Sequence, residues 1–174
     1  MRKINSELKE RLKKIRLLIL DVDGVLTDNG VFISDDGMEA KKFNISDGMG
    51  IYLAQKAGIE VAFISGRKSK ATQLRAKELG IKHAFLDASQ KNGPYQKIKG
   101  ELKIEDQEIA YVGDDLLDVP VLRKVGLPIA VKNSNSVAKK YAAYVTKANG
   151  GQGAVREVID LILESKRVNP EDFL

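Results

Sequence analysis

Cysteine and tryptophan are absent from the sequence, and histidine occurs once. Without cysteine, the chain can form no disulfide, no thiolate zinc site and no cysteine nucleophile. A chain without disulfides also fits a reducing compartment. The one histidine, His83, stands at the start of a predicted strand, where we interpret it as structural. A histidine phosphotransfer mechanism therefore has no agent in this sequence.

Long hydrophobic runs are missing as well. Residues 1–16, MRKINSELKERLKKIR, are charged throughout and lack the apolar centre of a signal peptide. No later stretch is apolar for long enough to cross a bilayer. We therefore expect a cytoplasmic protein with no membrane partner.

Aromatic residues are few, at 6% of the chain, and the formal net charge is +5. The excess of basic residues is typical of a solvated lysine-rich surface, and it also fits a modest attraction for anionic substrates. Because no basic stripe is interleaved with aromatic residues, we expect no nucleic-acid partner. A chain of 174 residues is long enough to bury its own core, so we predict a single domain over residues 1–174.

What the sequence does contain is a regular alternation of short apolar runs and helical patterns. The runs lack polar positions at every second residue, as expected for strands that are buried on both faces. Alternating strands and helices predict an α/β fold, a three-layer Rossmann-like parallel sheet with helices on both faces. The predicted strands are LLILDV (17–22), VAFIS (61–65), HAFLD (83–87), IAYVG (109–113), PIAV (128–131) and YAAYVT (141–146). The clearest helical patterns are GMGIYLAQKAG (48–58), KSKATQLRAKELG (68–80), NGPYQKIKGELK (92–103) and GAVREVIDLILESKR (153–167).

One segment interrupts this alternation. VFISDDGMEAKKF (31–43) has Asp36–Gly37 between two short β-like runs, which predicts an inserted β-hairpin directly after the first strand. A hairpin at this place overhangs the carboxyl ends of the strands. Open α/β sheets bind their ligands at that edge.

Polar side chains follow four of the predicted strands, at or soon after the point where each strand ends. Each residue alone has an ordinary explanation as a turn, a helix cap or a solvated lysine. Because the carboxyl ends of parallel strands share one edge of the sheet, we expect these side chains to converge. They are Asp21, Asp23, Ser65, Arg67, Lys91, Asp114, Asp115 and Asp118.

Asp21 and Asp23 pose a particular problem, because they follow the apolar run LLIL and lie two residues apart. Like charges repel, and removing either carboxylate from water costs free energy. A divalent cation at this edge would offset the clustered negative charge. The pair therefore predicts a metal site.

This arrangement resembles the haloacid dehalogenase superfamily, whose members are mostly Mg²⁺-dependent phosphatases. DVDGVLTD is similar to the first motif of that superfamily, Ser65 to the second, Lys91 to the third and GDDLLD to the fourth. The resemblance implies that Asp21 attacks phosphorus and becomes an aspartyl-phosphate, and that Asp23 is the general acid and base. It also implies that Ser65 hydrogen-bonds the phosphoryl oxygens and that Lys91 holds the phosphoryl group electrostatically.

The same resemblance implies a cofactor and its ligands. Mg²⁺ is held by the Asp21 carboxylate, the Asp23 main-chain carbonyl and the Asp114 carboxylate, since this ion prefers hard oxygen ligands. Asp115 and Asp118 have three possible tasks: they bind the ion, bind its waters or orient the lysine.

A closer resemblance is to the cap-less 3-deoxy-D-manno-octulosonate 8-phosphate phosphatase family. The similar segments are DVDGVLTDNG, the hairpin, KKFNISDGMGI, ISGRKS, YVGDDLLDVPVL and GGQGAVREV. The resemblance implies a small acidic sugar phosphate as substrate, hydrolysed in the lipopolysaccharide sugar pathway. It also implies a homotetramer with the hairpins packed at its centre and each active site completed by a neighbouring subunit. Val31, Phe32 and Ile33 fit such burial, or else a lid packed on its own subunit.

Further substrate contacts follow from this resemblance. Arg67 and Arg75 match arginines that contact substrate, and an arginine fork suits a carboxylate. Arg75 also fits a solvated helix face. Another set of residues matches the substrate-contacting loop after the hairpin and also fits the N-cap of the next helix. These residues are Asn44, Ser46, Asp47 and Gly48.

Three other functions stay open at the level of the sequence. Tyr52 and Leu117 stand where some family members have polar contact residues, and Gln152 interrupts a glycine-rich turn, so the exact substrate is open. A close alternative is another cap-less sugar phosphatase, such as one that acts on a sialic-acid-type 9-phosphate. A phospho-receiver domain would place its acceptor after the third strand, where Asp87 stands, but would have no use for Asp23 or the hairpin. A non-catalytic oligomerisation module is disfavoured by the intact carboxylates at the strand ends.

Overall fold

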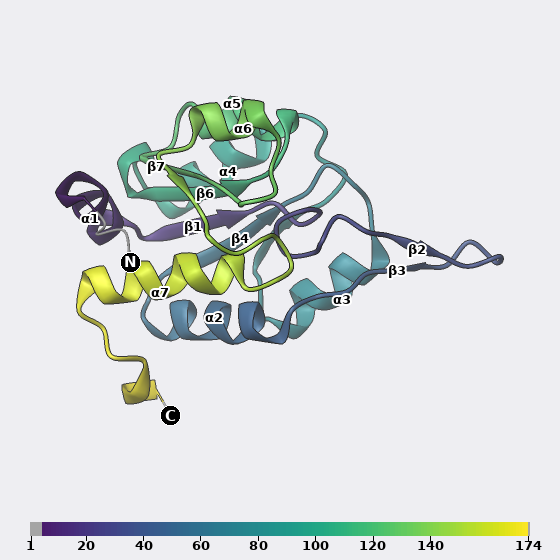
Figure 1. The fold of residues 1–174 in the computed structure, drawn as a ribbon, viewed down its shortest axis with the longest axis horizontal. Helices are drawn as coiled ribbons and strands as arrows, with labels where there is room; N and C mark the ends of the chain where they lie inside the picture. The colour runs from purple at the N-terminus through teal and green to yellow at the C-terminus, as the bar shows by residue number, and fades with distance from the viewer. Residues whose placement is uncertain (1–4, 174) are drawn as a thin grey trace.

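The computed structural model describes residues 5–173, and its centre is a six-stranded sheet (Figure 1). Every pair of neighbouring strands in this sheet is parallel within the described residues. The strands, in spatial order, are β5 (His83–Phe85), β4 (Glu60–Ile64), β1 (Leu17–Leu20), β6 (Ile109–Gly113), β7 (Leu127–Ala130) and β8 (Tyr144–Val145). The predicted parallel α/β fold is therefore confirmed.

Helices cover both faces of the sheet (Figure 1). One layer consists of α1 (Ser6–Lys14), α2 (Ile45–Lys56), α3 (Lys70–Glu78) and α7 (Ala154–Lys166). The opposite layer consists of α4 (Asn92–Leu102), α5 (Val119–Leu122) and α6 (Ser136–Tyr141). Short 3₁₀ helices complete the chain: η1 (Asp106–Glu108), η2 (Leu116–Asp118) and η3 (Pro170–Phe173).

Strand β1 shows why the strand sequences are apolar without alternation. Leu18 and Leu20 pack with the first helical layer, and Leu17 and Ile19 pack with the second. Both faces of the strand are therefore buried, so every position carries an apolar residue. None of the helices in residues 5–173 has the length and hydropathy needed to cross a membrane.

The predicted hairpin follows β1 and projects from the body of the molecule (Figure 1). Its strands, β2 (Phe32–Ile33) and β3 (Glu39–Ala40), pair antiparallel and are two residues long each. The turn is closed by a hydrogen bond from the Gly37 amide to the Ser34 carbonyl, at 2.8 Å. Phe32 and Ile33 are 71% and 73% exposed, so they do not form a lid on their own subunit.

Two segments differ from the prediction. The charged N-terminal stretch forms α1, which buries Leu12 and packs against α7, although the sequence analysis predicted no helix there. The predicted strand 141–146 pairs only at Tyr144 and Val145, because Asn135 caps α6 and that helix runs on to Tyr141. The helical signal of α1 was present in the sequence, since Leu8, Leu12 and Ile15 follow the cap Asn5 at helical spacing, but the high charge of the stretch obscured it. The segment 141–146 is ambiguous because a short apolar run fits the end of a helix as well as a strand.

The order of the strands makes the pair β1 and β6 the switch point of the sheet. The chain moves outward from β1 through β4 to β5, and then returns to the other side of β1 to form β6. The strand order therefore reverses between β1 and β6, and open α/β sheets bind ligands at the carboxyl ends of such strands. Asp21 directly follows β1 and Asp114 directly follows β6.

Candidate active site

The acids at the ends of β1 and β6 converge, as the sequence analysis expected. The Asp21 amide donates to the Val112 carbonyl at 3.0 Å, so the β1–β6 pairing extends to the first acid. One carboxylate oxygen from each of Asp21, Asp114 and Asp118 lies within 4.8 Å of the other two. Side chains that are far apart in the sequence therefore form a single acidic cluster at the switch point of the sheet.

Lys91 is the cation of this cluster. Its side chain is 1% exposed, and its Nζ lies 2.7 Å from Asp21 Oδ2 and 2.6 Å from Asp118 Oδ1. Burial by itself lowers the pKa of the Lys91 ammonium, but the two carboxylates outweigh burial and raise that pKa above its ordinary value. Lys91 is therefore charged and holds Asp21 in place.

Asp118 has both carboxylate oxygens engaged within the described chain. Its Oδ1 accepts from Lys91 and from the Tyr111 hydroxyl, the latter at 2.5 Å. Its Oδ2 accepts from the Asp114 and Asp115 amides, at 2.8 and 3.0 Å. Of the three tasks considered for Asp118, these contacts favour orienting the lysine. They also hold the backbone that carries Asp114.

The donor set fits a divalent cation. Burial and the nearby Asp118 carboxylate raise the pKa of Asp21 to about 7. Burial and the Asp21 carboxylate likewise raise the pKa of Asp114 to about 8. Carboxylates that resist ionisation in each other's presence are stabilised by a cation, and Mg²⁺ prefers hard oxygen ligands. Asp21 and Asp114 supply such oxygens.

Gly24 brings the loop after β1 into contact with this cluster. It has a φ of 81°, and a side chain at this position would overlap the Asp114 carboxylate. The glycine therefore serves both the turn and the close approach of the two strand-end loops. The loop before α7 also contacts the loop after β1, because the Gly151 amide donates to the Val25 carbonyl at 2.9 Å.

Asp23 lies beside the acidic cluster and has its own cation, Lys41. Asp23 Oδ1 is 2.6 Å from Lys41 Nζ, and the Lys41 side chain is fully buried. Within the described residues, Asp23 Oδ2 is shielded from solvent and has no hydrogen-bond partner. Lys41 opens the segment KKFNISDGMGI, and no role was predicted for it. Its only signal in the sequence is its place in that segment.

Ser65 and Arg67 lie in the loop after β4, as predicted. Ser65 is buried, and its Oγ accepts from the Arg67 amide at 3.3 Å. Arg67 is exposed, and its Nε lies 4.0 Å from Asp23 Oδ2. Glu39 of the hairpin accepts from Arg67 Nη2 and from Ser69 Oγ, both at 2.7 Å. The base of the hairpin is therefore tied to the edge of the sheet by ionic contacts.

The other predicted substrate contacts form a group at the start of α2. Asn44 caps α2 and accepts from the amides of Ser46 and Asp47, at 2.8 and 3.2 Å. Arg75 donates to the Asn44 carbonyl at 3.3 Å and lies against Gly48. These residues contact one another, and their cap role in the sequence analysis matches the structure for Asn44.

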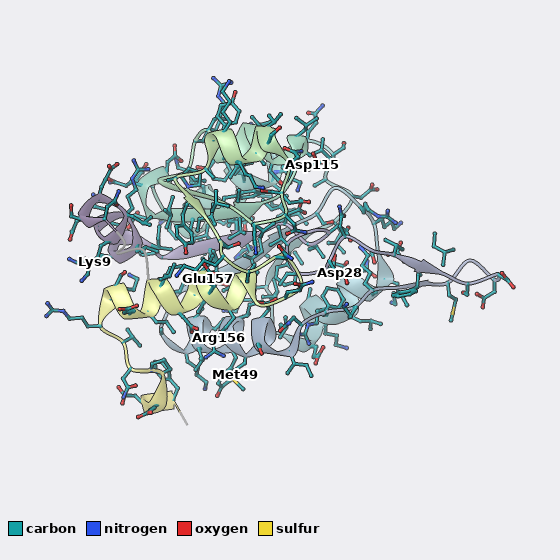
Figure 2. All side chains as sticks on the ribbon, in the orientation of Figure 1. Lys9, Asp28, Met49, Asp115, Arg156 and Glu157 are labelled. Carbon is teal, nitrogen blue, oxygen red and sulfur yellow. The ribbon has the colours of Figure 1, made fainter. Side chains whose placement is uncertain are left out.

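Asp47 caps a helix other than its own. Its side chain is buried, and its Oδ1 accepts from the Arg156 amide in the first turn of α7, at 2.8 Å. Figure 2 shows Arg156 on α7 beside α2, which carries Met49 two residues after Asp47. Burial raises the pKa of the Asp47 carboxyl, and the donors at the start of α7 oppose that rise. Asp47 thus joins the two helices.

Known proteins are similar to this chain in sequence and in structure. Residues 87–159 match the family model of haloacid dehalogenase-like hydrolases. The chain is 45% identical over 160 residues to the 3-deoxy-D-manno-octulosonate 8-phosphate phosphatase of Escherichia coli strain K12, covering 92% of this chain and 85% of that protein.

Solved structures agree with the sequence comparison. The 3-deoxy-D-manno-octulosonate 8-phosphate phosphatase of Yersinia pestis is 41% identical, with a TM-score of 0.93 and coverage of 94% of this chain and 89% of that chain. The phosphatase of the same name from Moraxella catarrhalis was solved with magnesium, phosphate and KDO. It is 37% identical, with a TM-score of 0.93 and coverage of 98% of this chain and 97% of that chain.

Proposed function

Since the chain belongs to the 3-deoxy-D-manno-octulosonate 8-phosphate phosphatase family of haloacid dehalogenase-like hydrolases, we propose that it hydrolyses this sugar phosphate. The products are the free sugar acid and inorganic phosphate, in lipopolysaccharide sugar biosynthesis. The chain is a Mg²⁺-dependent phosphoric monoester hydrolase. The observation that carries the proposal is the cluster of carboxylates around Lys91 at the switch point of the sheet.

In the first half-reaction, Asp21 is the nucleophile. One carboxylate oxygen forms a bond to phosphorus while the bond from phosphorus to the sugar oxygen breaks, giving an aspartyl-phosphate. Asp23 donates a proton to the departing sugar oxygen. The Asp21 and Asp114 carboxylates and the Asp23 main-chain carbonyl would hold Mg²⁺. When bound, the ion supplies positive charge that offsets the negative charge of the phosphoryl oxygens.

In the second half-reaction, Asp23 acts as a base. It takes a proton from the water that attacks the aspartyl-phosphate, and the bond between phosphorus and the Asp21 oxygen breaks. Inorganic phosphate leaves and Asp21 is restored. Lys91 stabilises the phosphoryl group electrostatically, and Ser65 donates a hydrogen bond to a phosphoryl oxygen. Because the nucleophile and the proton carrier are separate carboxylates, Asp21 can be ionised while Asp23 carries the proton for the leaving group.

Recognition of the sugar acid is assigned to cations and polar groups outside the acidic cluster. Arg67 lies close to Asp23, and its guanidinium can bind a carboxylate through two parallel hydrogen bonds. The remaining substrate contacts are assigned to the group at the start of α2, whose Asn44 donates to the Gly151 carbonyl at 3.4 Å, beside the loop after β1. That group is Asn44, Ser46, Asp47, Gly48 and Arg75.

A homotetramer completes the proposal. Phe32, Ile33 and Met38 of the hairpin are 71%, 73% and 69% exposed, which fits burial of the hairpins against each other. That residues 1–174 form a single domain and that the protein is cytoplasmic stay predictions from the sequence.

Phosphate release from a panel of sugar phosphates tests the function. The panel contains 3-deoxy-D-manno-octulosonate 8-phosphate, a sialic-acid-type 9-phosphate and simple hexose phosphates, each with Mg²⁺ and with chelator. We expect the highest kcat/KM for the octulosonate and no turnover with chelator. A higher value for the nine-carbon substrate or equal values across the panel would contradict the assigned substrate. A protein that releases no phosphate at all would contradict the reaction.

A further inference from the structure

Lys41 lies at the end of the hairpin, directly after β3, and its side chain is buried. Its side chain is 0% exposed, whereas the side chain of the adjacent Lys42 is 64% exposed. A buried ammonium is costly unless its charge is paired and its protons are used in hydrogen bonds. The contacts of Lys41 therefore indicate what its burial serves.

The Lys41 ammonium has three polar neighbours, and they come from different elements. Nζ lies 2.6 Å from Asp23 Oδ1 in the loop after β1, 3.5 Å from Thr72 Oγ1 on α3 and 3.6 Å from Glu39 Oε1 on β3. The shortest contact is with the residue assigned to proton transfer. Thr72 is fully buried as well, so its contact with the ammonium is shielded from solvent.

The contact with Lys41 occupies one carboxylate oxygen of Asp23 and leaves the other oxygen without a hydrogen-bond partner among the described residues. Oδ1 is bound to Lys41, while Oδ2 is shielded and has no hydrogen-bond partner within residues 5–173. Arg67 Nε lies 4.0 Å from Oδ2, beyond hydrogen-bond distance. Buried carboxylate oxygens are nearly always hydrogen-bonded in native proteins, so one without such a partner calls for an explanation. An oxygen that must receive and deliver a proton during turnover provides one.

We propose that Lys41 is a positioning residue that fixes the Asp23 carboxylate, so that Oδ2 is the oxygen that transfers the proton. The inference rests on the proposed function, because it concerns the acid–base step of that reaction. The hairpin then has a second task besides subunit contact, since it supplies the lysine that aims the general acid.

The dependence on the leaving group separates this role from a merely structural one. An alkyl phosphate such as the octulosonate 8-phosphate releases an alkoxide and needs a proton from Asp23. 4-Nitrophenyl phosphate releases a stable phenolate and needs none. We expect Lys41→Met to lower kcat/KM for the alkyl phosphate on the order of 10- to 100-fold more than for the aryl phosphate, because general acid catalysis contributes roughly 100-fold or more.

Both values are measured on one preparation, so partial unfolding of the variant cancels from their ratio. Asp23→Asn is the reference for a lost proton donor and should show the same selective loss. Lys42→Met is the matched control, since Lys42 is exposed and pairs with Asp28 at 2.6 Å. For Lys42→Met, the ratio of kcat/KM for the alkyl phosphate to kcat/KM for the aryl phosphate should equal that of the wild type. Should Lys41→Met fail to fold, the ratio is measured on Lys41→Gln, which keeps a donor without the charge.

Equal losses on both substrates in the Lys41 variant would overturn the inference. A selective loss in Lys42→Met, or none in Asp23→Asn, would overturn it as well. Failure of the proposed function looks different, because the wild type would then release no phosphate from either ester. If the wild type prefers another alkyl phosphate, the same ratio measured with that ester tests Lys41 independently of the assigned sugar.

Discussion

Asp21 is held between a buried ammonium and a backbone amide. Lys91 Nζ contacts its Oδ2 and the Val22 amide donates to its Oδ1 at 2.7 Å. These contacts engage both oxygens of the carboxylate and hold its orientation. The chemistry at the scale of the residue therefore depends on the charge of Asp21 more than on its shape.

Asp21→Asn tests this directly. The amide keeps the shape of the side chain but is no nucleophile, so we expect phosphate release to fall about 1,000-fold or more while the protein still unfolds cooperatively. Steady-state phosphate release and thermal unfolding measure the two effects. Asp160→Asn, on the surface of α7, is the control and should keep full activity. Substantial turnover in the Asp21→Asn variant would show that Asp21 is not the nucleophile.

The raised pKa values of Asp21 and Asp114 predict a link between pH, stability and Mg²⁺. The folded state keeps these protons up to about pH 7 and 8, whereas aspartates of the unfolded chain lose theirs near pH 4. In chelator, the contribution of the pair to the free energy of unfolding therefore falls as pH rises from about 4 to about 8.

Mg²⁺ should reverse this loss, because it binds the ionised carboxylates. We expect it to raise the unfolding temperature more at pH 8 than at pH 5.5, in thermal unfolding with and without chelator. Comparing the two conditions at each pH cancels the titration of distant groups. Asp114→Asn should lack most of the increase. An equal increase at both pH values would contradict the prediction.

At the scale of the element, α7 depends on another helix for its cap. Gly153 precedes α7 and offers no side chain to its first amides. Asp47, from the first turn of α2, supplies the acceptor through its bond with the Arg156 amide. Because the acceptor is buried, its removal leaves donors unsatisfied in the interior.

Asp47→Ala should lower the free energy of unfolding by about 1–3 kcal/mol, as measured by urea denaturation. Asp47→Asn keeps an accepting oxygen and should lose less. The KM of the Asn variant also tests the predicted substrate contact, since a cap alone would leave KM unchanged. An Ala variant as stable as the wild type would show that Asp47 is not the cap of α7.

At the scale of the whole molecule, the hairpin is the one described projection that carries exposed apolar side chains away from the body (Figure 1). If the proposed tetramer buries it, Phe32→Asp should place a charge in that interface and shift the protein toward smaller species. Sedimentation velocity measures the distribution. Val137→Asp, on α6 and 39% exposed, is the control and should not change it. A Phe32→Asp variant that stays tetrameric would exclude the hairpin from the interface.

Prediction of the fold from the sequence succeeded where apolar runs alternate with helical patterns and where turn residues mark the ends of a strand. The buried parallel strands and the hairpin at Asp36–Gly37 are examples. It missed α1, whose Leu8, Leu12 and Ile15 lie at helical spacing within a highly charged stretch. It also placed too long a strand at 141–146, where a short apolar run fits a helix end and a strand equally well. For the site, Asp118 was placed correctly at the strand-end edge, but its choice among three tasks needed its hydrogen-bond partners.

The sequence by itself determined that Asp21 and Asp114 meet, because acids that follow parallel strands share one edge of the sheet whatever the details of packing. Only the tertiary structure decided that Lys41 holds Asp23 and that Asp47 caps α7. Those pairs join elements whose relative placement depends on how helices and hairpin pack on the sheet. That packing is a property of many side chains together, and no local spacing in the sequence encodes it.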